Sequence, residues 1–224
     1  MAEVGRRAPP RHEAELRVRA EALAGRTLGE IARALGRDAR AAPGVRTKGR
    51  AGDLVERALG ASAGSAAEPD FPSLGIELKT IPVDADGRVC ESTFVCTIQL
   101  ARIADESWAD SWARRKLSRV LWVPVEADRP LADRRIARPL LWTPSPDEES
   151  ALRSDYDEIA SRIGLGAIAD LTAHTGLYLQ VRPKAAHGRA RTSALGPDGE
   201  PLAVTPRGFY LRPTFTTLIL SRYL

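Results

Sequence analysis

The sequence is poor in the residues that build metal cages and covalent cross-links. It has only two cysteines, Cys90 and Cys96, and three histidines, His12, His174 and His187. These residues show neither CxxC nor HxxxH spacing, which argues against a zinc site. Two thiols allow one bridge, but cytosolic thiols stay reduced, so both cysteines are expected to be structural.

Long apolar runs are missing as well. No run approaches the ~20 apolar residues that span a membrane, and the first segment, MAEVGRRAPPRHEAE, lacks the apolar core of a secretory signal. We therefore expect a cytoplasmic protein without a membrane partner. Residues 1–10 are expected to be a flexible tail, and residues 11–224 a single domain with an N-terminal and a C-terminal lobe.

Charge is distributed unevenly along the chain. Residues 1–60 contain 13 Lys and Arg against 8 Asp and Glu, residues 61–179 contain 13 against 19, and residues 180–224 contain 7 against 2. Basic ends can hold a polyanion while an acidic middle holds a cation. Solvated, arginine-rich surface explains the same distribution equally well.

The most informative stretch is Asp70-Phe-Pro-Ser-Leu-Gly-Ile-Glu77-Leu-Lys79. Side chains alternate faces along a strand, so Glu77 and Lys79 are expected on one side. The proline-bearing turn after Asp70 can return the chain, so that the two carboxylates converge. Such a pair suits Mg²⁺, and a nearby lysine can orient an attacking water. The pattern indicates a centre that cleaves phosphodiesters.

An Asp…Glu-x-Lys pattern alone is common on solvated surfaces, but longer runs accompany it. Six of them resemble the MutH family of mismatch-repair endonucleases: GASAGS (60–65), PDFPSLGIELKTIPVD (69–84), ESTFVC (91–96), RRKLSRVLWVPVE (114–126), LQVRPKAA (179–186) and PRGFYL (206–211). The resemblance covers nearly the whole chain, from about residue 27 onward.

The resemblance implies an α/β fold: a restriction-endonuclease-like mixed sheet flanked by helices, with two lobes forming a DNA cleft. It implies a Mg²⁺-dependent, sequence-specific endonuclease that nicks the unmethylated strand of hemimethylated GATC sites, 5′ of the G. The implied partners are double-stranded DNA, the MutL ATPase and, indirectly, the mismatch sensor MutS. The protein is expected to be a monomer.

Site residues follow from the same resemblance. The implied catalytic residues are Glu56, Asp70, Glu77 and Lys79, with Asp70 and Glu77 as metal ligands and the Leu78 carbonyl as a further one. The implied DNA-binding residues are Lys48, Phe94, Lys116, Arg182, Lys184 and Tyr210. Arg182 is chemically suited to guanine, because its guanidinium can donate two hydrogen bonds, to O6 and N7. Tyr210 is the candidate sensor of the adenine methyl group.

Two other classes of protein remain open. A stand-alone GATC restriction enzyme related to Sau3A would share the acidic pair and the lysine, although such relatives usually have an additional DNA-binding domain. A non-catalytic DNA-binding module would need the basic ends of the chain but not the acidic pair.

Several elements are expected around this centre. Thr27 and Glu30 have the spacing of a capping box that opens a helix, and 147–163 has the apolar spacing of another, followed by a helix ending at His174. The Asp-Gly dipeptide at 86–87 predicts a hairpin that pairs the strand 74–81 with a return strand, 93–100.

Overall fold

A strand buried along nearly its whole length forms the centre of a mixed sheet. Strand β3 (Val120–Glu126) is buried along almost its whole length, so it needs cover on both edges and both faces. Strand β1 (Glu77–Val83) pairs with it in parallel, from Glu77 opposite Val120 to Val83 opposite Glu126. Strand β4 (Leu140–Trp142) pairs with the other edge in antiparallel orientation. The order is β1-β3-β4.

The predicted hairpin partner of β1 is wrong. The turn that follows β1 forms only an isolated bridge between Val83 and Val89. The return strand, β2 (Thr93–Thr97), pairs instead with β8 (Arg207–Leu211) in another sheet. A local turn signal was outweighed by long-range pairing, because the buried β3 offers β1 a complete parallel ladder.

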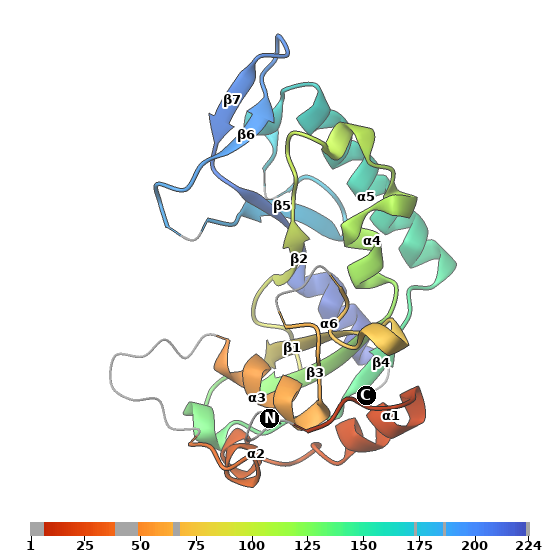
Figure 1. Cartoon of the computed structure of the whole chain (residues 1–224), viewed down its shortest axis with the longest axis vertical. Coiled ribbons are helices and arrows are strands. Elements are labelled where there is room, and N and C mark those ends of the chain that lie inside the picture. The colour runs from red at the N-terminus through yellow and green to blue at the C-terminus, as the bar shows by residue number, and fades with distance from the viewer. Residues whose placement is uncertain (1–6, 39–48, 65–67, 173, 186, 223–224) are drawn as a thin grey trace. The chain divides into compact units, whose positions relative to one another are not determined.

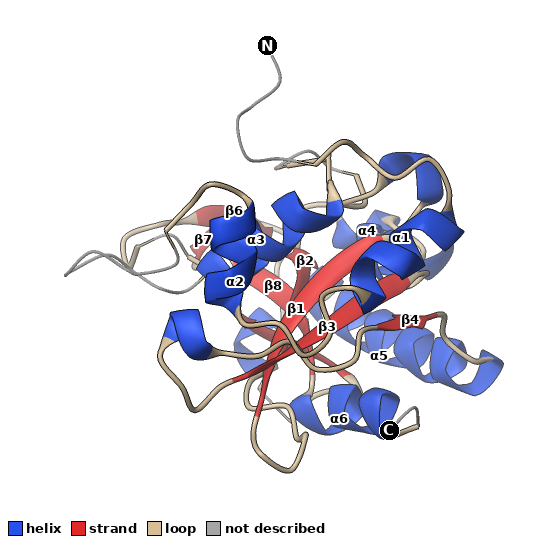
Figure 2. Ribbon diagram, turned by 90° about the horizontal axis from the view of Figure 1, so that it is seen from below, coloured by secondary structure: helices blue, strands red, loops and turns tan. Residues whose placement is uncertain are grey.

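Three helices lie over one face of this sheet (Figure 2): α1 (Glu13–Glu21), α2 (Leu28–Ala34) and α3 (Arg50–Leu59). Their apolar side chains share one core with those of β1 and β3. The predicted capping box opens α2, since the Glu30 N–H donates to Thr27 Oγ1 and the Thr27 N–H donates to Glu30 Oε2. These backbone and side-chain hydrogen bonds also lower the pKa of Glu30.

The computed structural model describes residues 7–38, 49–64, 68–172, 174–185 and 187–222. The chain divides into two compact units. The first contains Met1–Glu91, Arg119–Thr143 and Ile219–Leu224, and the second contains Ser92–Ser118 and Pro144–Leu218. Within the first unit, the Arg7 N–H donates to the Arg57 carbonyl at 3.0 Å, so the predicted tail has contacts from Arg7 onward. A DNA cleft between two lobes stays a prediction.

The second unit is built on an antiparallel sheet of order β2-β8-β5, with β5 at Leu179–Pro183. A separate two-stranded sheet consists of β6 (Thr192–Leu195) and β7 (Pro201–Val204). The helices, which Figure 1 labels, are α4 (Trp112–Leu117), α5 (Pro146–Gly164) and α6 (Pro213–Ser221). The residues of α6 from Ile219 onward are assigned to the first unit. The predicted α/β class with a mixed sheet flanked by helices is confirmed.

The acidic stretch forms the predicted helix, α5, but the helix predicted to end at His174 is wrong. Among the described residues of that stretch, only a 3₁₀ turn forms, at Ile168–Asp170. Gly166 has a φ of 75°, a left-handed conformation that ends α5 and redirects the chain. No helix in the described part of the chain is both long and apolar enough to cross a membrane.

A buried carboxylate on α5 holds the entry to β5. Asp155 is 6% exposed and accepts three backbone N–H bonds, from Leu177 at 2.6 Å, Tyr178 at 2.7 Å and Leu179 at 2.8 Å. A buried carboxylate needs such donors to offset its lost hydration. Asp155 thereby connects α5 to the first residue of a sheet strand.

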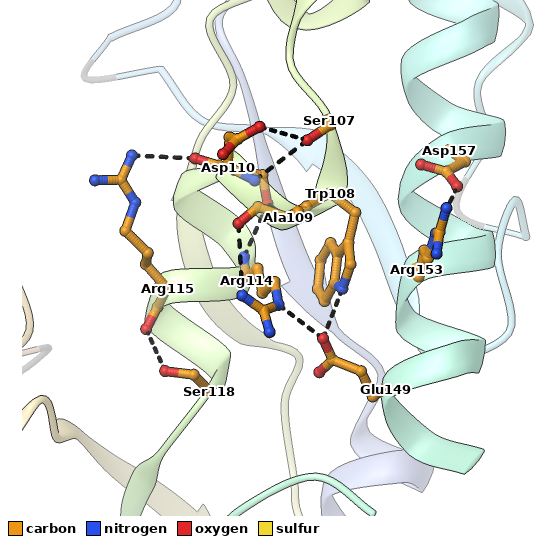
Figure 3. Close-up of polar contacts among 11 residues, drawn as sticks. Ser107, Trp108, Ala109, Asp110, Arg114, Arg115, Ser118, Glu149, Arg153 and Asp157 are labelled. Carbon is orange, nitrogen blue, oxygen red and sulfur yellow. Dashed lines mark hydrogen bonds and ion pairs between the residues drawn. The ribbon is translucent and has the colours of Figure 1, made fainter. Parts of the chain in front are cut away.

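We expect Asp155→Asn to lower the free energy of unfolding by about 2–4 kcal/mol, because a neutral amide oxygen accepts fewer and weaker bonds and leaves a buried N–H unsatisfied. Urea unfolding followed by circular dichroism measures the change. The matched control is Asp157→Asn on the same helix. Asp157 makes an exposed ion pair with Arg153 at 3.5 Å (Figure 3), so its loss should cost less than about 1 kcal/mol. Equal effects of the two substitutions would contradict the assigned role.

Candidate active site and DNA-binding face

A tight turn returns the chain to the start of β1. The Phe71 N–H donates to the Ile76 carbonyl at 2.9 Å, and the Ile76 N–H donates back to Phe71 at 3.3 Å. Between them lie a 3₁₀ turn, Pro72–Leu74, and Gly75 with a φ of 63°. Glycine adopts this left-handed conformation without a steric cost. The turn brings Asp70 back beside the strand.

Asp70, Glu77 and Lys79 lie close together at the start of β1. Asp70 Oδ2 accepts a hydrogen bond from the backbone N–H of Leu78 at 2.8 Å. Leu78 lies between Glu77 and Lys79 in the sequence. Lys79 Nζ donates to Glu77 Oε1 at 2.7 Å, as expected for side chains two apart on a strand. Glu77 is only 2% exposed. The structure therefore brings together a buried carboxylate, an ammonium group and a second carboxylate.

Glu56 comes from another element. It lies on α3 and lines a cavity that Lys79 and Thr80 of β1 also line. Glu91 lines the same cavity, and the sequence reasoning did not select it, although it opens the ESTFVC run. An acidic side chain from a helix and a lysine from a strand thus border one hollow in the first unit.

The donor set fits a hard cation. Asp70 and Glu77 offer carboxylate oxygens, and the backbone of Leu78 lies between them. Among the described residues, no group of three or more His, Cys, Asp or Glu side chains is arranged to hold a metal ion by itself. Mg²⁺ commonly binds through one or two carboxylates, with water and substrate phosphate oxygens completing its shell. The residues present are compatible with that mode of binding.

Four of the five DNA-binding candidates of the second unit, Phe94, Arg182, Lys184 and Tyr210, lie together at one face of its sheet. Phe94 on β2 lies opposite Tyr210 on β8, and their rings meet edge to face with centroids 5.2 Å apart. Lys184 Nζ lies 4.1 Å from the centroid of the Phe94 ring, within cation–π range. Gly208 makes this packing possible, because a Cβ there would lie 2.9 Å from Phe94 Cε2 and 3.0 Å from the Cys96 carbonyl oxygen.

Arg182 lies on β5, beside this aromatic pair. Its register partner is Gly208, and Tyr210 is the partner of Gln180 two residues earlier. Arg182 Nη1 donates to Ser92 Oγ at 2.9 Å. Burial raises the pKa of Tyr210, and the charge of Arg182 opposes that shift. The phenol therefore keeps its proton at neutral pH and can donate a hydrogen bond.

Lys116 belongs to the last turn of α4, with Nζ 5.0 Å from the centroid of the Trp112 ring. Glu149 on α5 connects this helix to α5, because its Oε1 accepts from Arg114 Nε of α4 at 2.8 Å (Figure 3). The same oxygen accepts from Nε1 of Trp108, which precedes α4, at 2.9 Å. The remaining DNA-binding candidate, Lys48, lies outside the described residues.

The sequence-derived candidates thus fall into two groups. Glu56, Asp70, Glu77 and Lys79 belong to the first unit, and Phe94, Lys116, Arg182, Lys184 and Tyr210 belong to the second. Sequence reasoning missed Glu91, Ser92, Gln180 and Gly208. All four lie in runs that carry the family resemblance, which was the only signal available for them.

A mixed sheet flanked by helices, with a Glu-x-Lys pair on one strand and an aspartate returned to it by a turn, defines the class of restriction-endonuclease-like proteins. Comparisons with known proteins specify the family. The model of the family described as "DNA mismatch repair enzyme MutH" matches residues 59–155.

Three curated relatives are each named "DNA mismatch repair protein MutH". The chain is 50% identical to that of Serratia proteamaculans over 221 residues, which cover 96% of this chain and 95% of the relative. It is 51% identical to that of Yersinia enterocolitica over 218 residues, with 96% and 95% covered. It is 50% identical to that of Salmonella paratyphi B over 221 residues, with 96% and 94% covered. The chain belongs to the MutH family and is a mismatch-repair endonuclease, as predicted.

We expect Gly208→Ala to displace the Phe94 ring, because the new Cβ meets both the ring edge and a backbone carbonyl. Overpacking of this kind costs about 1–3 kcal/mol of stability. The chain has four phenylalanines, so selective ¹³C labelling can follow the Phe94 ring signals by NMR. Gly188→Ala is the control, since a Cβ there meets nothing within 4 Å. Unchanged Phe94 signals in Gly208→Ala would show that the close packing is not as described.

Proposed function

We propose that this chain is a Mg²⁺-dependent endonuclease that recognises GATC in duplex DNA and nicks the unmethylated strand of hemimethylated sites, 5′ of the G. The observation that carries the proposal is the ion pair between the buried Glu77 and the half-buried Lys79, beside Asp70, in a member of the MutH family. Ion pairs that only decorate a surface have exposed carboxylates. A buried carboxylate with an ammonium group beside it is instead typical of functional sites, and this pair suits a reaction on a phosphate.

The metal ligands in this proposal are Asp70, Glu77 and the Leu78 carbonyl. When bound, Mg²⁺ supplies positive charge that stabilises the phosphate oxygens and makes water a better nucleophile. Glu77, being buried, favours a cation beside it, because an ionised carboxylate away from water requires compensating charge.

The side chains of the protein position the water and the phosphate. The ammonium of Lys79 has three N–H donors, of which one is directed to Glu77 Oε1; the others can orient a water for attack on phosphorus. Glu56 borders the same cavity and serves as the accessory carboxylate. Hydrolysis breaks the phosphodiester bond on the 5′ side of the guanine.

Recognition is assigned to the second unit. Arg182 donates to guanine O6 and N7, Phe94 and Tyr210 contact bases, and Tyr210 senses the adenine methyl group. Lys184 and Lys116, together with Lys48, contact phosphates or groove edges. The shared sheet face of Phe94, Arg182 and Tyr210 supports this division, because side chains that read adjacent bases must project together.

A nicking assay tests the proposal. Hemimethylated GATC duplexes should be nicked on the unmethylated strand only, fully methylated duplexes should resist, and activity should require Mg²⁺. Lys79→Met should lower the rate by a factor of about 10²–10³, comparable to removing one preorganised charge-stabilising donor, while affinity for DNA stays close to wild type. Near-normal nicking by Lys79→Met would refute the assigned role.

Lys184→Met is the matched control for this assay. It removes the same charge from a group assigned to phosphate, so it should weaken binding to all sequences alike and lower the salt slope by about one. The two lysine variants therefore separate chemistry from binding.

We also propose that the activity is gated by MutL, with MutS acting indirectly. A four-base-pair site recurs every few hundred base pairs by chance, so an ungated nickase would damage replicating DNA. A partner that favours the DNA-binding conformation raises its population, and a few kcal/mol of differential binding is enough.

We expect cognate MutL with ATP to raise the nicking rate of the monomer by at least about tenfold, which needs ~1.4 kcal/mol of differential binding. The assay uses limiting enzyme at physiological salt, with MutL without ATP as the control. Equal rates with and without MutL and ATP would instead favour a stand-alone GATC restriction enzyme.

A further inference from the structure

One hydroxyl oxygen in the second unit accepts two hydrogen bonds from the strand that carries Arg182. Ser92 Oγ accepts from Gln180 Nε2 at 2.9 Å and from Arg182 Nη1 at 2.9 Å. Ser92 directly precedes β2, whereas both donors belong to β5, 88 and 90 residues further along the chain. The contact is therefore a product of the fold and not of local sequence.

The two donors occupy one face of the sheet. Gln180 and Arg182 are two residues apart on β5, so their side chains project to the same side. Gln180 lies opposite Tyr210, which in turn lies opposite Phe94 on β2. Ser92 thus bonds to the same face that bears the candidate base-contacting residues.

The hydrogen-bonding capacity of the serine determines what it can do here. A hydroxyl oxygen has two acceptor lone pairs, and Gln180 and Arg182 together use both. Gln180 is only 4% exposed, so its amide gains from a fixed partner away from water. The bond from Arg182 uses one of the five N–H donors of the guanidinium, which leaves others for a ligand.

We propose that Ser92 is a positioning residue for sequence recognition: with Gln180, it fixes the guanidinium of Arg182 in the orientation that reads guanine. The inference rests on the proposed function and names a residue that acts through Arg182. A long arginine side chain loses rotamer entropy when it is ordered on a ligand. Fixing it before binding lowers the cost of ordering it on the base, and holds it away from orientations that suit other bases.

The consequence is a separation between discrimination and general affinity. The contacts with phosphates assigned to Lys184 and Lys116 are independent of sequence. Loss of the Ser92 hydroxyl should therefore reduce the preference for guanine, while binding to unrelated duplexes changes little. A purely structural role would instead weaken all binding alike.

The experiment uses the full chain and fluorescence anisotropy without divalent metal. Three duplexes are compared: a hemimethylated GATC site, the same site with 7-deazaguanine in place of each guanine, and a scrambled sequence. Removing N7 should weaken wild-type binding by about tenfold, as expected for losing half of a bidentate contact. For Ser92→Ala this penalty should fall to about threefold or less, as it should for Arg182→Ala.

Three further variants keep the result interpretable. Ser92→Thr retains the hydroxyl at a half-buried position and should restore the wild-type penalty. Ser150→Ala, at an exposed serine on α5, should leave it unchanged. If Ser92→Ala folds poorly, Gln180→Met tests the same network, and should also reduce the 7-deazaguanine penalty. Thermal unfolding and affinity for the scrambled duplex report the folded state of each variant.

The outcomes are distinct. If the wild-type protein shows no preference for GATC, the proposed function on which the inference rests is refuted. A wild-type penalty that persists in both Ser92→Ala and Gln180→Met would overturn the inference alone. Loss of affinity for all three duplexes in equal proportion, with the penalty intact, would assign Ser92 a structural role and likewise overturn it.

Discussion

The candidate active site depends on one constraint, the burial of a carboxylate on a strand. An ionised carboxylate away from water costs several kcal/mol unless opposite charge and hydrogen bonds accompany it. Lys79, two residues after Glu77, supplies that charge at 2.7 Å because both side chains share a face. A slip of one residue in the pairing of β1 with β3 would direct Leu78 to that face instead. The parallel register therefore decides on which face of the sheet the two charges lie.

The carboxylate of Asp70 is positioned by the same strand, β1. The Asp70 carboxylate accepts from the backbone N–H of Leu78, so the position of this carboxylate is tied to that of β1. Phe71 and Ile76, which close the turn, are 2% and 0% exposed. Their burial fixes the turn to the core, and the proposed cation site benefits from ligands held by packed elements.

The sequence predicted what local chemistry determines. The alternation that joins Glu77 to Lys79, the capping box at Thr27 and the turn after Asp70 each involve residues within about ten positions. The pairing partner of β1 could not be read in this way, because the burial of β3 decides it. Ser92 and Arg182 are 90 residues apart, and no periodicity links them. Roles in catalysis and recognition came from family resemblance, and they stay predictions.

The strand that carries Arg182 is held at two points. Asp155 binds the N–H groups that lead into β5, up to Leu179, and Ser92 binds the side chains of Gln180 and Arg182 further along. Between these points the backbone pairs with β8. Discrimination among bases is a difference between two binding free energies, and a mobile side chain lowers that difference by adapting to the wrong base. A short strand fixed both at its backbone and at its side chains limits such adaptation, so in the proposed function the contacts that hold β5 contribute to the specificity assigned to Arg182.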